Sequence, residues 1–155
     1  LHEMFERRKK GLADRASDRV GLAPLADHVY TRMSGGERQL ALIARALAQE
    51  APLMVMDEPT ASLDFGNQAR VLDEVRALAR AGTGVMMATH DPDQAFLVAD
   101  RVALLAGGRL LADAPPDQAI TPETMREVYG IEVEVTDLAL ASGERRRVCV
   151  PVRRA

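Results

Sequence analysis

The sequence predicts an α/β domain built around a pair of parallel strands. Two short apolar runs, residues 53–56 and 85–89, have the length and composition of strands. The first run shows no polar alternation, which is typical of a strand buried on both faces. An amphipathic helix is expected between them over residues 65–81, and the glycines at 82 and 84 end it. This order favours a βαβ unit with a right-handed crossover.

The composition is that of an ordinary globular domain. The chain has 155 residues, of which 47% are hydrophobic and 28% charged, enough for one domain with a core. The net charge of −3 gives no basic field for nucleic acid. The apolar runs are too short to span a bilayer. The single cysteine, Cys149, excludes an internal disulfide, so we expect a reducing compartment, by default the cytoplasm.

Small helical elements are predicted before the first strand. Residues 1–11 are expected to end one helix at Gly11, and residues 13–20 to form another. The basic run at 7–10 is interpreted as a solvated helix end, with a phosphate or lipid contact as the alternative. A third helix is expected over residues 35–49. Its buried face is predicted from helical spacing to contain Leu40, Ile43, Ala44 and Leu47.

After the second strand, the sequence predicts a short helix, a hairpin, another helix and a strand pair. Asp91-Pro92 and Thr121-Pro122 each combine a cap with a first-turn proline, and they begin helices over 92–98 and 122–128. Gly107-Gly108 predicts a hairpin between residues 101–106 and 109–112. Strands are expected at 131–135 and 148–152. The arginines at 145–147 are expected in an exposed turn, with an anion site as the alternative.

Ser34-Gly35-Gly36-Glu37 begins the helix over 35–49. Ser34 and Glu37 have the spacing of a capping box, in which each side chain binds the other residue's backbone amide. The two glycines allow a ligand or another chain to approach the backbone closely. Free amides at a helix N-terminus attract phosphate. These residues fit either an ordinary capped helix or a phosphate site.

Two carboxylates, Asp57 and Glu58, follow the first apolar strand directly. Ligands of open α/β sheets bind at the carboxyl ends of strands. An aspartate there can hold Mg²⁺ on a nucleotide, and a neighbouring glutamate can orient or deprotonate water. The alternative is a strand end followed by a polar loop.

Taken together, these segments closely resemble the nucleotide-binding domain of ABC ATPases. Residues 33–37 resemble the signature motif, usually written L-S-G-G-Q, with Met33 and Glu37 at its ends. Residues 53–58 resemble the Walker B strand with its catalytic glutamate. Residues 62–64 resemble the D-loop, and His90 resembles the switch histidine. The resemblance implies the C-terminal portion of the P-loop NTPase fold, containing part of the helical subdomain and part of the parallel core sheet. We expect divisions at 1–45, 46–114 and 115–155, the last a helix and β tail.

The family resemblance also implies roles for these residues and a set of partners. Glu58 and His90 are expected to be catalytic, Asp57 to support Mg²⁺, and Asp64 to link two sites across a dimer. Two such domains would bind ATP head to tail, and permease subunits and a substrate-binding protein would complete an importer at the cytoplasmic face of the membrane. Residues 110–135 resemble the tails of metal-chelate importers for iron-siderophore, haem, cobalamin or molybdate. The ATP contacts are expected from Ser34, Gly35, Gly36, Glu37 and Asp64.

The Walker A motif of this family, G-x-x-x-x-G-K-[ST], is not found in the sequence. The only lysines are Lys9 and Lys10, and neither follows a glycine or precedes Ser or Thr. We expect part of a longer ATPase, inactive and marginally stable alone. The alternatives are a short non-catalytic protein that binds an ATPase partner, and an ATPase of the DNA-repair type.

Overall fold

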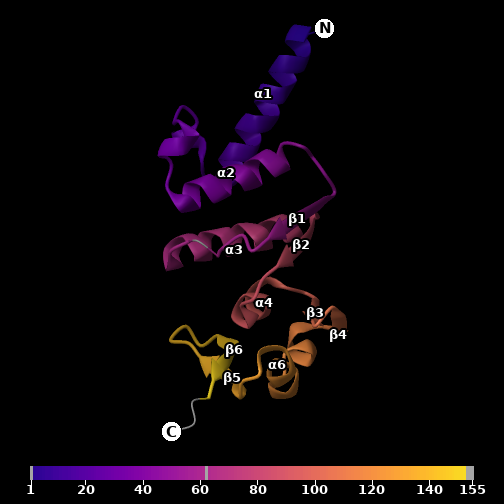
Figure 1. Cartoon of the computed structure of the whole chain (residues 1–155). Coiled ribbons are helices and arrows are strands. Elements are labelled where there is room, and N and C mark those ends of the chain that lie inside the picture. Colours follow the sequence, from indigo (N-terminus) through magenta and orange to yellow (C-terminus); the bar gives the residue numbers. More distant parts are fainter. Residues whose placement is uncertain (1, 62, 153–155) are drawn as a thin grey trace. The chain divides into compact units, whose positions relative to one another are not determined.

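The computed structural model describes residues 2–61 and 63–152, with side chains from residue 10 onward (Figure 1). The chain forms two compact units, Leu1–Ala88 and Thr89–Ala155.

The first unit begins with helices. Helix α1 (His2–Arg19) is followed by two 3₁₀ helices, Ala23–Leu25 and Tyr30–Arg32, and then by α2 (Gly35–Leu47). The prediction that one helix ends at Gly11 and another begins at 13 was wrong, because α1 runs through both positions. A glycine inside a helix costs only about 1 kcal/mol relative to alanine, which the flanking turns outweigh.

The predicted βαβ unit is present in the first unit. Strand β1 (Leu53–Asp57), helix α3 (Phe65–Arg80) and strand β2 (Gly84–Ala88) follow in order (Figure 1). The strands pair in parallel, with Leu53 opposite Gly84 and Asp57 opposite Ala88. This register makes the two strands end at the same level of the sheet.

The core of the first unit depends strongly on α3. Its predicted apolar face is confirmed, since all four members are buried: Val71, Leu72, Val75 and Leu78. On α2, Leu40, Ile43 and Ala44 are buried as predicted, whereas Leu47 is half-buried.

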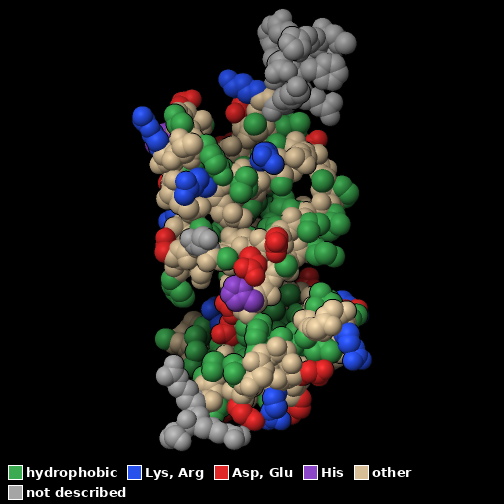
Figure 2. Space-filling model, viewed as in Figure 1, with side chains coloured by type: hydrophobic (Ala, Val, Ile, Leu, Met, Phe, Trp, Pro, Cys, Tyr) green, Lys and Arg blue, Asp and Glu red, His purple; other side chains and the backbone are tan. Residues whose placement is uncertain are grey.

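Strand β1 is buried on one face only. Met54 and Met56 are buried, but Val55 is 69% exposed and Leu53 is 52% exposed. On β2, Met86 is likewise exposed, and hydrophobic side chains reach the surface over these strands (Figure 2). The prediction of a fully buried strand was therefore wrong. The physical reason is that the described sheet has two strands and only one packed face.

The second unit contains short helices and two antiparallel strand pairs. Helix α4 is followed by the β3–β4 pair, by helices α5 and α6, and by the β5–β6 pair. A shared core of Ala95, Ile120, Met125 and Val133 joins α4 to the later elements. The bounds are α4 (Pro92–Val98), β3 (Val102–Ala106), β4 (Arg109–Ala114), α5 (Pro116–Ala119), α6 (Pro122–Tyr129), β5 (Val133–Ala139) and β6 (Arg145–Pro151).

The predicted turn at residues 145–147 was wrong, because these arginines begin β6. Arg147 Nε donates a hydrogen bond to Asp137 Oδ1 at 3.0 Å across the strand pair. The chain reverses earlier, where Leu140 N bonds to Glu144 O and Gly143 has a φ of +84°. A glycine accommodates that angle without strain, and the sequence analysis overlooked it. Among the described residues, no helix is long and apolar enough to cross a membrane.

We predict that the first unit is more sensitive to truncation on α3 than on the exposed side of α2. Leu78→Ala should lower the free energy of unfolding by about 2–5 kcal/mol, because it leaves a cavity at a fully buried position. The matched control Leu42→Ala, at a leucine that is 42% exposed, should change it by less than about 1 kcal/mol. Pulse proteolysis in urea measures both variants at low protein concentration. Equal decreases in the free energy of unfolding of the two variants would show that Leu78 of α3 is not a central core residue.

Candidate functional site

The start of α2 has the predicted capping box. Ser34 N donates to Glu37 Oε2 at 2.7 Å, and Glu37 N donates to Ser34 Oγ at 3.3 Å. The hydrogen bond from the Ser34 backbone lowers the pKa of Glu37 and favours its ionised form. Ser34 and Gly35 are exposed, so this helix start is accessible to a ligand or to another chain.

Gly36 is buried against α3, which the sequence analysis did not anticipate. A Cβ added to Gly36 would lie only 2.7 Å from the Cβ of Asn67, with Cγ and Oδ1 of that side chain closer still. A side chain at position 36 would therefore require the side chain of Asn67 to move. The absence of a side chain at Gly36 therefore allows α2 and α3 to pack closely within this chain.

Asp64 caps α3 as predicted, and Asn67 connects this cap to α2. Asp64 Oδ1 accepts a hydrogen bond from Asn67 N at 2.9 Å, and its Oδ2 accepts one from Asn67 Nδ2 at 2.6 Å. The bond from the Asn67 backbone lowers the pKa of Asp64. Because Asn67 also packs on Gly36, the structure brings the signature motif and the end of the D-loop together.

Asp57 and Glu58 lie at the end of β1. Asp57 is the last paired residue of the strand, and Glu58 N then donates to Ala88 O at 3.0 Å. Glu58 has a φ of +41°, which is left-handed and uncommon for a residue other than glycine. Such a conformation costs about 1–3 kcal/mol and is found most often at functional sites. Both carboxylate residues are exposed.

A compact turn leads from Glu58 to Asp64. Ala61 N bonds to Glu58 O at 3.2 Å, and Thr60, only 3% exposed, lies inside the turn. Gln68 Nε2 donates to Thr60 O at 3.3 Å and to Leu63 O at 3.1 Å, which holds the turn against α3. Gln68 could not be found from the sequence, because a side chain that binds backbone carbonyls leaves no motif. Ser62, the first residue of the predicted D-loop, lies outside the described residues.

His90 belongs to the second unit, where it is exposed just before α4. Its loop is held by local hydrogen bonds on both sides. Thr89 Oγ1 accepts from Asp91 N at 3.1 Å and bonds to Gln94 Oε1 at 3.0 Å. Asp91 Oδ1 caps the helix by accepting from Asp93 N at 2.9 Å, as predicted.

Two later elements also bind this loop. Tyr129 Oη donates to the backbone carbonyl of His90 at 2.8 Å, and Cys149 N donates to Asp93 Oδ1 at 2.7 Å. Burial raises the pKa of Tyr129, so its hydroxyl remains a donor at neutral pH. The sequence carries no signal for either contact, because the partners lie 39 and 56 residues apart.

Asp57 is the residue to be considered as a support for Mg²⁺. Within the described ranges, no cluster of three or more His, Cys, Asp or Glu side chains could hold a metal. Mg²⁺ on a nucleotide is usually held by one or two carboxylates together with phosphates and water. Asp57, an exposed carboxylate at a strand end, fits that kind of support.

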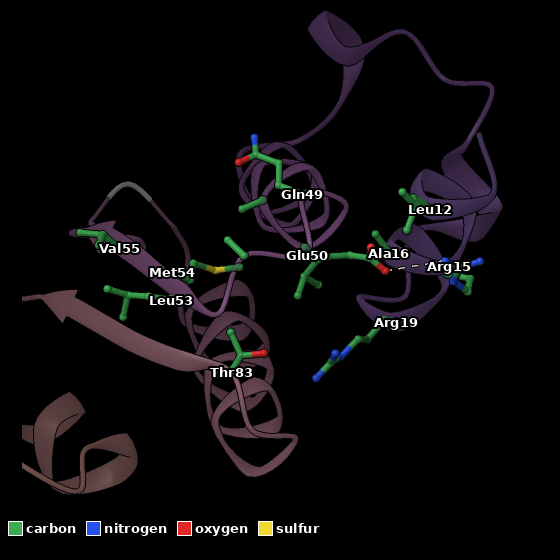
Figure 3. A pocket seen from close by; sticks show the side chains of 13 residues that line it. Leu12, Arg15, Ala16, Arg19, Gln49, Glu50, Leu53, Met54, Val55 and Thr83 are labelled. Carbon is green, nitrogen blue, oxygen red and sulfur yellow. Dashed lines mark ion pairs between the residues drawn. The ribbon is translucent and has the colours of Figure 1, made fainter. Parts of the chain in front are cut away.

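A cavity of about 440 Å³ lies elsewhere in the first unit, bordered by α1, the end of α2, β1 and Thr83 (Figure 3). Arg15 and Glu50 form an ion pair beside it, with Nη2 and Oε1 4.0 Å apart. None of the residues that line it is a predicted site residue.

Known proteins are similar to this chain over much of its length. The family model described as "ABC transporter" matches residues 2–61. An uncharacterized ABC transporter ATP-binding protein of Haemophilus influenzae is 40% identical over 124 residues, which are 80% of this chain and 47% of that protein. The chain belongs to the ABC transporter ATP-binding family.

Two other relatives of this ABC chain are named for import. The hemin import ATP-binding protein HmuV of Streptomyces coelicolor is 45% identical over 77% of this chain and 43% of its own. The cobalamin import ATP-binding protein BtuD of Halobacterium salinarum is 44% identical over 80% and 31%. The chain therefore spans less than half of the length of each of these three relatives.

Solved structures confirm the predicted fold class, a portion of the α/β P-loop NTPase fold of ABC ATPases. A structure described as an inward-facing metal-chelate type ABC transporter aligns with a TM-score of 0.88 and 31% identity, covering 92% of this ABC chain and 57% of that one. An ATP-binding cassette in its ADP conformation aligns with a TM-score of 0.65 and 25% identity, covering 69% and 42%.

We predict that the two glycines Gly36 and Gly66 respond oppositely to an added methyl group. Gly36→Ala should lower the free energy of unfolding by about 1–3 kcal/mol, because it drives Asn67 away from the Asp64 cap. Gly66→Ala, whose Cβ would lie 3.5 Å from Asp64 Oδ1, should be neutral or stabilising by up to about 1 kcal/mol. Pulse proteolysis in urea compares them. A Gly36→Ala variant as stable as Gly66→Ala would show that α2 and α3 do not pack this closely.

Proposed function

We propose that this chain is part of the ATP-hydrolysing subunit of an ABC importer. The observation that carries the proposal is the end of β1, where Asp57 and Glu58 leave the sheet and Glu58 has a strained, left-handed backbone. Family membership gives this pair of acids its chemical context. The capped start of α2 adds an accessible phosphate-binding helix end.

In this proposal, Ser34, Gly35 and Gly36 bind the γ-phosphate of an ATP molecule that is held mainly by a second ATPase domain. The Ser34 hydroxyl and the helix-end amides are the donors, and the helix dipole favours the negative charge. Glu37 supports this arrangement through the capping box, whose hydrogen bonds fix Ser34. Glu37, which stands where the family motif usually has Gln, is the remaining proposed ATP contact at this helix start.

Asp57 and Glu58 have different roles at the end of the strand. Asp57 supports Mg²⁺, which neutralises phosphate charge when it is bound. Glu58 acts as general base toward the attacking water, a role worth about 10²–10⁴ in rate. The bond from Glu58 N to Ala88 O holds the backbone of this base at the end of the sheet.

His90 and Asp64 complete the proposed machinery. His90 donates to the γ-phosphate and stabilises the charge that develops there. Asp64 links the two sites across the head-to-tail dimer. Its contact with Asn67, which packs on Gly36, supports a joint movement of the D-loop end and the signature motif.

The proposed cargo class is a metal chelate such as iron-siderophore, haem, cobalamin or molybdate. The relatives named for hemin and cobalamin import support this class, as does the alignment with a metal-chelate type transporter. The partners are a second ATPase domain, a pair of permease subunits and, indirectly, a substrate-binding protein. In this proposal, the protein is a peripheral subunit on the cytoplasmic face of the inner membrane. The import names of these relatives favour transport over a DNA-repair ATPase.

We expect Glu58→Gln in the complete ATPase to lower ATP turnover by at least about a hundredfold, because the amide cannot accept the proton of water. ATP-dependent dimers should persist, since the substitution leaves the phosphate contacts in place. Steady-state phosphate release and size-exclusion chromatography with ATP measure the two effects.

Glu50→Gln is the matched control for Glu58→Gln. Glu50 is also a glutamate with a left-handed backbone, with a φ of +51°, but it lies at the end of α2 beside Arg15. Its variant should keep normal turnover. Retained hydrolysis in Glu58→Gln would remove Glu58 from the role of base.

We further propose that the chain is the C-terminal part of a longer ATPase whose Walker A segment precedes it, and that it does not hydrolyse ATP alone. The DNA upstream of the codon for Leu1 tests this proposal. An open frame that encodes a glycine-rich G-K-[ST] loop is expected. An in-frame stop immediately upstream would instead favour a short protein that binds an ATPase partner without hydrolysis.

A further inference from the structure

We propose that Tyr129 is a positioning residue for His90, through the hydrogen bond from its hydroxyl to the His90 carbonyl. This inference rests on the proposed function, because it assigns to Tyr129 an effect on ATP hydrolysis that passes through His90. The inference adds helix α6 of the second unit to the candidate site. All of the sequence motifs lie before α6 in the chain.

This hydrogen bond holds the peptide group that follows His90. Tyr129 Oη lies 2.8 Å from His90 O. His90 directly precedes Asp91, the N-cap of α4, so its carbonyl lies outside the hydrogen-bond ladder of that helix. A donor from another element can therefore hold this peptide group, and with it the direction in which the His90 side chain leaves the backbone.

Helix α6 is a firm support for such a donor. Met125, in the middle of α6, is only 1% exposed and shares a core with Ala95 of α4. Thr121 caps the start of α6, and Gly130 ends it in a left-handed conformation with a φ of +68°. Tyr129 is the last residue of α6 and His90 lies just before α4, so the hydrogen bond connects the ends of two helices that share one core.

A second contact limits the movement of the same loop. Cys149 N of β6 donates to Asp93 Oδ1 at 2.7 Å, which ties the first turn of α4 to the β5–β6 pair. Hydrogen bonds among Thr89, Asp91 and Gln94 also hold the chain around His90. The Tyr129 contact differs from these because it acts on the His90 peptide group itself.

The test is a double-mutant cycle in the complete ATPase. Tyr129→Phe removes the hydroxyl and keeps the ring, so the fold is preserved. We expect kcat to fall about three- to tenfold, the effect of losing one hydrogen bond, with KM for ATP changed less than about twofold. His90→Ala should lower kcat by about a hundredfold. In the double variant, Tyr129→Phe should cause no further loss.

Arg126→Gln is the control on the same helix. It removes the ion pair from Arg126 Nη2 to Glu132 Oε2 at 2.7 Å and leaves the His90 contact intact. Its kcat should match that of the unmodified enzyme. A general loosening of α6 would lower kcat in both Tyr129→Phe and Arg126→Gln, and this result would overturn the inference.

The other outcomes separate this inference from the proposed function. If His90→Ala is impaired and Tyr129→Phe is normal, the inference fails and the proposed role of His90 stands. If the two losses multiply in the double variant, Tyr129 acts independently of His90 and the inference fails. If His90→Ala itself has normal turnover, the proposed role of His90 fails, and the inference fails with it.

Discussion

The parallel pairing of β1 with β2 is the constraint on which the candidate site of the first unit depends. Asp57 lies opposite Ala88, and the next amide, that of Glu58, bonds to the same alanine. This last bond fixes the point at which the chain leaves the sheet. The left-handed turn at Glu58 follows from that point, because the chain must bend at once to reach the Asp64 cap of α3.

The site is assembled from backbone ends and helix caps, not from a buried cluster of side chains. The capping box of α2 and the Asp64 cap of α3 satisfy amides that each helix leaves free at its start. Asn67 joins these two helix starts by binding one cap and packing on Gly36. The interactions that stabilise the helices therefore also determine where the exposed residues of the candidate site lie.

Local chemistry was predictable from the sequence, and contacts between distant segments were not. The α3 stripe, the caps at Ser34, Asp64 and Asp91 and the Gly107-Gly108 hairpin each depend on a few neighbouring residues, and the structure has all of them. The one-sided burial of β1 depends on how many strands the sheet contains, which an apolar run does not encode. The contacts of Asn67, Gln68 and Tyr129 depend on tertiary packing, and ordinary polar residues at such positions form no recognisable pattern.

Because β1 and β2 end at the same level, the number of residues in each strand is restricted as well as their type. Side chains alternate between the faces of a strand, so removing one residue from β2 shifts its register against β1 by one place. Such a deletion would either leave the Glu58 amide without Ala88 or turn the packed face of β2 outward. Single-residue insertions and deletions in these two strands should therefore disrupt the structure more than substitutions on its exposed face, at Leu53, Val55 and Met86.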